Sequence, residues 1–129
     1  MEGDTIAKKR AFFSFDFDED QNLKVHMVGQ MKLPASPFDA ADWSMKEAAP
    51  QHNWEQEAEA RIRRSDVVVV LVGPKTHRAS GVLKEVAITR RLGKPIVQII
   101  GYKNSSPTPV PNAGRLLKWT WENMTSVLT

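Results

Sequence analysis

Glu85 is the side chain with the strongest sequence indication of a position near a reactive or ligand-binding site. It lies early in a helical pattern that begins near Ser80 and follows the uninterrupted apolar run at 66–73. A run without polar alternation is typical of a central strand in a parallel sheet, buried on both faces. In open parallel sheets, ligands bind beside the carboxyl ends of the strands, in the loops that lead into helices. The sequence therefore predicts that Glu85 lies near the ligand-binding edge of a sheet.

The carboxylate of Glu85 also has a simpler interpretation. Acidic residues are common in early helical turns, because the positive end of the helix dipole favours them there. Against this, Glu85 has Ile88 and Thr89 at the i+3 and i+4 positions, so no basic partner on its own helix accounts for it. On the residues alone, both interpretations of Glu85 stay open.

The elements that would position Glu85 alternate between strand and helix. The aromatic segment 10–15 is predicted as the first strand, and the acidic stretch 16–20 suits the start of a helix. A short edge strand is expected at 36–39, because edge strands tolerate proline, and a polar connection is expected over 40–52. The remaining strands are predicted at 66–73, 95–100 and 117–121.

Helices are predicted where apolar residues recur four positions apart, which is the spacing of one helix face. The helix that carries Glu85 is expected to end at Gly93, because glycine is common just past the last turn. A short final helix is expected to reach Leu128. The apolar stripes are Leu23, Met27 and Met31; Trp54, Ala58 and Ile62; and Val82 with Val86 and Leu83 with Ala87.

This alternation predicts an α/β protein with a flavodoxin-like parallel sheet of four to five strands and helices on both faces. The strands at 66–73 and 95–100 are expected to be adjacent, parallel and buried, because right-handed crossovers join neighbours. Trp119 and Trp121 are expected on one side of the last strand. Residues 1–129 are predicted to form a single domain, with a polar leader at 1–8 and an exposed proline-rich loop at 102–113.

Several classes of site are disfavoured by the residues. The segment 13–16 that ends the first strand has no glycine, so neither a Walker loop nor a dinucleotide fingerprint is present there. No metal site is expected, since the chain lacks cysteine and His26, His52 and His77 have no ligand spacing.

Charge and hydropathy limit the partners. Eighteen basic and fifteen acidic residues are scattered along the chain and give a net charge of only +3, so no nucleic-acid partner is expected. No apolar run approaches the roughly 20 residues of a membrane helix, so no membrane partner is expected. The start of the chain lacks a signal pattern, and a cytoplasmic location is therefore the expectation.

Four segments resemble a TIR domain. Residues 10–16 resemble its opening strand, which ends in serine and an aromatic residue before an acidic helix start, and 65–73 resemble its third strand. The segments Ser80–Val86 and Gly93–Val97 resemble the helix and strand that follow. The resemblance spans residues 8 to 101 and is strongest to the bacterial TIR-like proteins of Thoeris anti-phage defence. One departure is Gly81, which stands where the family carries a tryptophan four residues before its glutamate.

The resemblance implies an enzyme that processes NAD. TIR enzymes cleave the nicotinamide–ribose bond, and Thoeris-type members release a cyclic ADP-ribose isomer as a messenger. Glu85 matches the family's glutamate and is thereby implied as the catalytic residue, with NAD as substrate and no further cofactor. Breaking this bond builds positive charge on the ribose, which a carboxylate stabilises. Nicotinamide leaves without a general acid, because it already carries positive charge in NAD.

Five further residues are expected to bind NAD. Ser14 ends the first strand and is placed to contact the ribose or a phosphate, or else to cap the next turn. Of Phe13 and Phe15, which alternate with it, one is expected in the core and the other at the pocket. Asp39 either reaches the ligand or is an ordinary turn residue. Trp43 either stacks on a base or packs in the core.

Two other functions stay open beside the NAD-processing enzyme. The chain is alternatively a non-catalytic TIR scaffold that acts by TIR–TIR association, for which Glu85 would be dispensable. It is alternatively an enzyme similar to nucleoside deoxyribosyltransferases, which would act on free nucleosides rather than NAD. A homo-oligomer is expected through TIR–TIR contacts, with the proline-broken segment 33–52 as the contact. NAD or a related nucleotide is the expected small-molecule partner.

Overall fold

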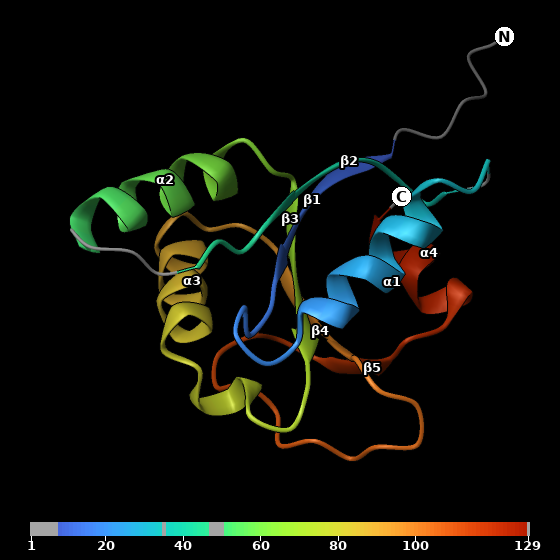
Figure 1. Ribbon diagram of the computed structural model, residues 1–129. Coiled ribbons are helices and arrows are strands. Elements are labelled where there is room, and N and C mark those ends of the chain that lie inside the picture. The colour runs from blue at the N-terminus through green and yellow to red at the C-terminus, as the bar shows by residue number, and fades with distance from the viewer. Residues whose placement is uncertain (1–7, 35, 47–50, 129) are drawn as a thin grey trace, which may run out of the picture.

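Five parallel strands form one sheet in the computed structural model, which describes residues 8–34, 36–46 and 51–128 (Figure 1). The sheet order is β2-β1-β3-β4-β5, and every neighbouring pair is parallel. This order confirms the flavodoxin-like α/β prediction, and β3 and β4 are neighbours as expected. The strands are β1 (Lys9–Ser14), β2 (Phe38–Trp43), β3 (Val67–Val72), β4 (Ile96–Ile100) and β5 (Leu116–Lys118).

Helices cover both faces of this sheet. Helices α2 and α3 lie on one face, and α1 and α4 lie on the other (Figure 1). The helices are α1 (Gln21–Met31), α2 (Gln51–Arg63), α3 (Ser80–Arg91) and α4 (Trp121–Leu128), and the short 3-10 turn η1 (Thr76–Arg78) precedes α3. None of the helices in these ranges is both long and apolar enough to span a bilayer.

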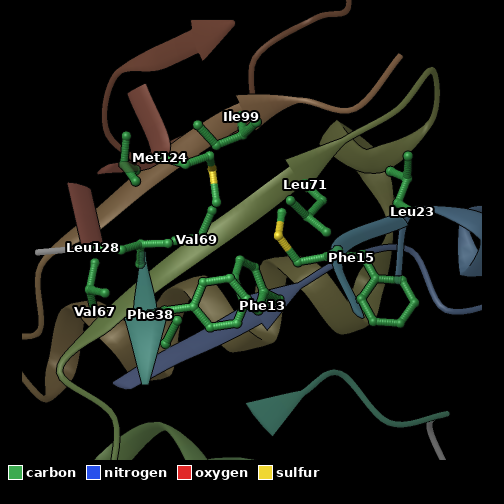
Figure 2. Packing of buried hydrophobic residues seen from close by; sticks show 13 residues of the cluster. Phe13, Phe15, Leu23, Phe38, Val67, Val69, Leu71, Ile99, Met124 and Leu128 are labelled. Atoms are coloured by element: carbon green, nitrogen blue, oxygen red, sulfur yellow. The ribbon is translucent and has the colours of Figure 1, made fainter. Parts of the chain in front are cut away.

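The core is divided by the sheet into two layers. Successive residues of a strand point to opposite faces, so Phe12 and Val68 pack with α2, whereas Phe13 and Val69 pack with α1 and α4. Figure 2 shows the second layer, in which Phe13 meets Phe38 edge to face at 5.3 Å between ring centroids. All six residues of β3 are buried, as expected for a central strand.

The end of α3 also agrees with the sequence. Gly93 adopts a positive φ of 68°, a conformation that side chains other than glycine rarely take. The amide of Lys94 donates to the carbonyl of Thr89 at 3.1 Å, and that of Gly93 donates to Arg90 at 3.1 Å. This pair of bonds closes the helix and returns the chain toward β4.

The expected end of the second strand is wrong. The sequence predicted a strand at 36–39 followed by a polar connection, but β2 runs from Phe38 to Trp43. The segment 40–43 lacks β-branched residues, so its pattern gave no strand signal. Pairing with β1 supplies its hydrogen bonds instead. Of the segment predicted as a self-association contact, residues 35 and 47–50 lie outside the described residues, as do residues 1–7 of the polar leader.

Three smaller expectations also need correction. Strand β5 ends at Lys118, so Trp119 and Trp121 do not share a strand face; Trp121 begins α4 and is 41% exposed. Leu83 and Ala87 are exposed rather than on the buried face of α3. The buried face of α3 instead includes Val82, Glu85, Val86, Ile88 and Thr89.

The proline-rich loop is not wholly exposed. Val110 is buried, and its backbone N–H and carbonyl both form hydrogen bonds with the buried side chain of Gln98 on β4. The Gln98 amide donates to the carbonyl of Val110 at 3.1 Å and accepts from its N–H at 2.7 Å. The same amide donates to the carbonyl of Gly114 at 2.9 Å. A single polar side chain in the core thus anchors the loop before β5.

Candidate active site at the carboxyl edge of the sheet

Glu85 is enclosed among hydroxyl groups. Its side chain is 1% exposed, although it belongs to a helix that begins at the protein surface. The hydroxyl of Ser14 donates to Glu85 Oε1 at 2.7 Å, and the hydroxyl of Ser44 donates to the same oxygen at 2.6 Å. Ser14 is the last residue of β1 and Ser44 follows β2, so three elements meet at one carboxylate oxygen.

The backbone of β1 and β2 fixes the position of Ser44. Its N–H donates to the carbonyl of Phe13 at 3.0 Å, which continues the pairing of the two strands. Its hydroxyl oxygen accepts a hydrogen bond from the N–H of Phe15 at 3.0 Å, and its O–H donates to Glu85 Oε1. The hydroxyl is thus oriented by the strand that ends beside it. Two hydroxyl donors thus converge on one oxygen of Glu85 and fix its position.

A cavity of about 190 Å³ adjoins Glu85. Residues 15–18 of the loop after β1 form one wall, residues 44–46 after β2 form another, and residues 79–82 at the start of α3 form a third. From β1, the sheet continues through β2 on one side and through β3 on the other. Such a switch point is where open α/β sheets bind their ligands. Glu85 therefore lies at the carboxyl edge of the sheet, where the sequence placed it; that a ligand binds there stays a prediction.

The pocket walls carry charges of both signs. Asp16 and Asp18 lie on the loop after β1, and Lys46 lies on the segment after β2. The Lys46 ammonium is 3.6 Å from Asp18, and both side chains are 72% exposed. An exposed ion pair of this kind contributes little stability. The ammonium can therefore exchange Asp18 for an anionic ligand at small cost.

The structure brings some of the predicted site residues together. Glu85 and Ser14 are in direct contact, and Phe15 lines the cavity. Phe13 is fully buried in the core layer below α1 and α4. Phe15 packs in the same core layer and is only 1% exposed, so both phenylalanines are core residues, although Phe15 also borders the cavity. The expected division of the two between core and pocket is therefore wrong.

Asp39 and Trp43 do not line the cavity. Asp39 is the second residue of β2, at the end of the strand opposite Ser44, and it is exposed. Trp43 stacks on Phe13, with 4.8 Å between ring centroids and an interplanar angle of 24°. The Lys24 ammonium lies 5.6 Å from the centre of the Trp43 ring. The packing interpretation of Trp43 is the one that its contacts support.

Ser44 and Lys46 line the cavity but were not predicted from the sequence. The signal for Ser44 was the one used for Ser14, a serine at the carboxyl end of a strand. It was not applied because the second strand was expected to end at Asp39. Among residues 8–34, 36–46 and 51–128, no group of three or more His, Cys, Asp and Glu side chains is arranged to hold a metal ion.

The sheet order is flavodoxin-like, and a buried glutamate on the helix after β3 is consistent with a TIR-like domain. The chain matches the family model described as Thoeris protein ThsB, TIR-like domain, over residues 12–105. That range includes Ser14, Ser44 and Glu85. The chain belongs to this TIR-like family of Thoeris anti-phage defence. None of the curated proteins compared with it matches.

Proposed function

We propose that this protein cleaves the nicotinamide–ribose bond of NAD, with Glu85 as the catalytic carboxylate. The observation that carries the proposal is the buried Glu85 beside a cavity at the switch point, held by the hydroxyls of Ser14 and Ser44. Membership of the TIR-like family supports the same reaction. The product is ADP-ribose or a cyclic ADP-ribose isomer, made as a nucleotide signal of anti-phage defence in the cytoplasm.

The chemistry requires one fixed anion. The bond from the ribose carbon to the nicotinamide ring nitrogen breaks, and its electron pair neutralises the charge of the ring. The ribose carbon becomes cationic, and a preorganised carboxylate stabilises that charge. Water then attacks the carbon and loses a proton to give ADP-ribose, or a nitrogen of the adenine base attacks and closes a cycle. The two serine hydroxyls hold Glu85 in place, so it need not reorganise during the reaction.

The size of the cavity limits how NAD is held. Pockets that bury a drug-sized ligand usually measure roughly 300–1,000 Å³, whereas this cavity measures about 190 Å³. The nicotinamide and its ribose therefore occupy the cavity, and the phosphates extend to the mouth, where Lys46 is available. The adenylate half then lies outside the described walls. A second copy of the chain, contacting through segment 33–52, would complete its binding site.

Nucleoside turnover separates NAD cleavage from the deoxyribosyltransferase alternative. The purified protein, activated in phage-infected cells, is incubated with NAD and in parallel with free deoxynucleosides. Release of nicotinamide without release of free bases from deoxynucleosides is the expected result. Base exchange on deoxynucleosides with no loss of NAD would replace the proposal by the transferase function.

Ser44→Ala is expected to lower kcat for NAD cleavage by about tenfold or more. The change removes a hydrogen bond to a charged group, worth roughly 1.5–3 kcal/mol, and each 1.4 kcal/mol is a factor of about ten in rate. Stability should also fall by about 1–3 kcal/mol, because the buried N–H of Phe15 loses its acceptor. Nicotinamide release and urea unfolding measure the two effects.

Ser65→Ala is the matched control for Ser44→Ala. Ser65 is also buried, and its hydroxyl donates to the carbonyl of Arg61 at 2.8 Å, at the opposite edge of the sheet. The rate of NAD cleavage by Ser65→Ala should equal that of the wild type. Equal rates for the Ser44 and Ser65 variants would contradict the role of Ser44 in holding Glu85.

A further inference from the structure

A second buried carboxylate, Asp20, lies at the same edge of the sheet but outside the cavity. It directly precedes α1 and is 2% exposed. The hydroxyl of Tyr102 donates to Asp20 Oδ1 at 2.6 Å, and the hydroxyl of Thr76 donates to Oδ2 at 3.4 Å. Thr76 belongs to η1, after β3, and Tyr102 follows β4. One carboxyl group therefore joins the segments that leave three neighbouring strands.

The packing around Asp20 leaves no spare room. The hydroxyl oxygen of Thr76 accepts the N–H of Gly73 at 2.7 Å, at the point where the chain leaves β3. A Cβ atom on Gly73 would lie 2.5 Å from Asp20 Oδ2 and 2.8 Å from Oδ1. Glycine at this position therefore lets the strand end approach the carboxylate. We call Asp20, Thr76 and Tyr102, together with the backbone of Gly73, the Asp20 clamp.

The Asp20 clamp connects two walls of the cavity. The wall at 15–18 leads directly to Asp20, whose N–H donates to the carbonyl of Asp16 at 2.8 Å and closes the loop into a turn. The wall at 79–82 begins directly after η1, and the N–H of Ala79 donates to the carbonyl of Thr76 at 3.1 Å. The contact between Asp20 and Thr76 is therefore a link between the loop after β1 and the start of α3.

The charge of Asp20 does not stabilise the fold. Burial raises the pKa of this carboxyl above its usual value, and the carboxylates of Asp16 and Glu19 raise it further, while the hydroxyls of Tyr102 and Thr76 act in the opposite direction. Since the folded state then favours the protonated form, the stability contribution of Asp20 falls as the pH rises through its ordinary pKa.

We propose that Asp20 is a positioning residue that sets the separation of the two cavity walls and so the fit of the ribose against Glu85. It acts through Thr76 on the wall at 79–82 and through its own loop on the wall at 15–18. Tyr102 keeps the carboxyl group turned toward β3 and β4. This proposal rests on the proposed function for its effect on catalysis, but the linkage of the walls is a property of the fold alone.

Hydrogen exchange tests the linkage without reference to activity. In Tyr102→Phe and Thr76→Val, amides of residues 16–20 and 79–83 should exchange at least about tenfold faster than in the wild type, the effect of losing roughly 1.4 kcal/mol of local stability. Amides of α2 should be unaffected. Trp119→Phe is the control, because it removes a side-chain hydrogen bond outside the clamp, from Trp119 Nε1 to Gln30 at 3.2 Å. Unchanged exchange at both walls in both variants would overturn the clamp.

The titration of Tyr102 gives a second readout that does not depend on activity. Tyr102 is the single tyrosine of the chain, so the phenolate absorbance reports this residue alone. Burial, the hydrogen bond to Asp20 and the charge of Asp20 raise the pKa of Tyr102 to about 12. In Asp20→Asn, which keeps an acceptor oxygen but loses the charge, the midpoint should fall. The same midpoint in both proteins would contradict the contact, provided circular dichroism shows that both stay folded.

The effect on catalysis is measured with NAD as the probe. Tyr102→Phe should lower kcat/KM about tenfold, mostly by raising KM, because the reacting groups remain but the ribose is held less closely. Faster exchange at the walls with unchanged KM would overturn the role of the clamp in positioning. If the activated wild type cleaves no NAD, the proposed function fails, whereas the exchange and titration results still decide whether Asp20 links the walls.

Discussion

Glu85→Gln is expected to lower the rate of NAD cleavage by about a hundredfold or more, the usual cost of one preorganised electrostatic contact. Glutamine keeps an oxygen that accepts the hydroxyls of Ser14 and Ser44, so the local hydrogen bonds persist. What the variant loses is the negative charge that faces the developing ribose cation. The fold should be retained, because volume and hydrogen bonding at this buried position are conserved.

Glu59→Gln is the matched control for Glu85→Gln. Glu59 lies on α2, on the same face of the sheet, and its carboxylate binds Arg63 and Arg91 at the protein surface. These arginines lower the pKa of Glu59, so it is also ionised at neutral pH. Removing its charge should leave the rate unchanged, because Glu59 does not line the cavity beside Glu85. A rate loss of similar size in both variants would indicate a general electrostatic effect rather than catalysis by Glu85.

Gly114→Ala is expected to lower the free energy of unfolding by about 2–4 kcal/mol, from backbone strain and overpacking together. Gly114 precedes β5 and adopts a φ of 81°, which alanine rarely takes. A Cβ atom there would lie 2.3 Å from the carbonyl oxygen of Ile96, which is backbone and cannot move aside cheaply. The carbonyl of Gly114 also accepts from Gln98, so its displacement would weaken the anchor of the loop.

Gly29→Ala gives the opposite expectation and serves as the control. Gly29 lies within α1, is exposed, and has no atom within 4 Å of an added Cβ. Alanine in a helix interior is favoured over glycine by roughly 0.5–1 kcal/mol. Urea unfolding should therefore show a lower midpoint for Gly114→Ala and an equal or higher midpoint for Gly29→Ala. Equal midpoints for the Gly114 variant and the wild type would show that the turn before β5 relaxes more easily than its geometry indicates.

The fold follows from the sequence where burial dominates. The run at 66–73 has only apolar residues at its centre, and only a central strand of a parallel sheet buries both faces. The stripe of Trp54, Ala58 and Ile62 likewise has one face to bury, and all three residues are buried under the sheet. The edge position of β2 was predicted correctly, but its end was not, because an edge strand is held by pairing on one side. Its segment at 40–43 had neither alternation nor β-branched residues.

Residues of the candidate site could be predicted only where the end of the neighbouring strand was predicted correctly. Ser14 and Glu85 were found because the strands before them carry strong patterns. Ser44 was missed with the end of β2, although the same argument applies to it. Asp20 gave no signal beyond a helix start, since its partners Thr76 and Tyr102 are distant in the sequence and meet it only when three strands are aligned.

Catalysis by Glu85 is tested most directly by measuring the nicotinamide that the protein releases from NAD. Wild type and Glu85→Gln are purified in parallel from phage-infected cells and incubated with NAD, and nicotinamide and the ADP-ribose products are separated by chromatography. We expect steady release of nicotinamide by the wild type and about a hundredfold less, or none, by Glu85→Gln. Equal release by the two proteins, or none by the activated wild type, would contradict catalysis by Glu85 and favour a scaffold that acts by association.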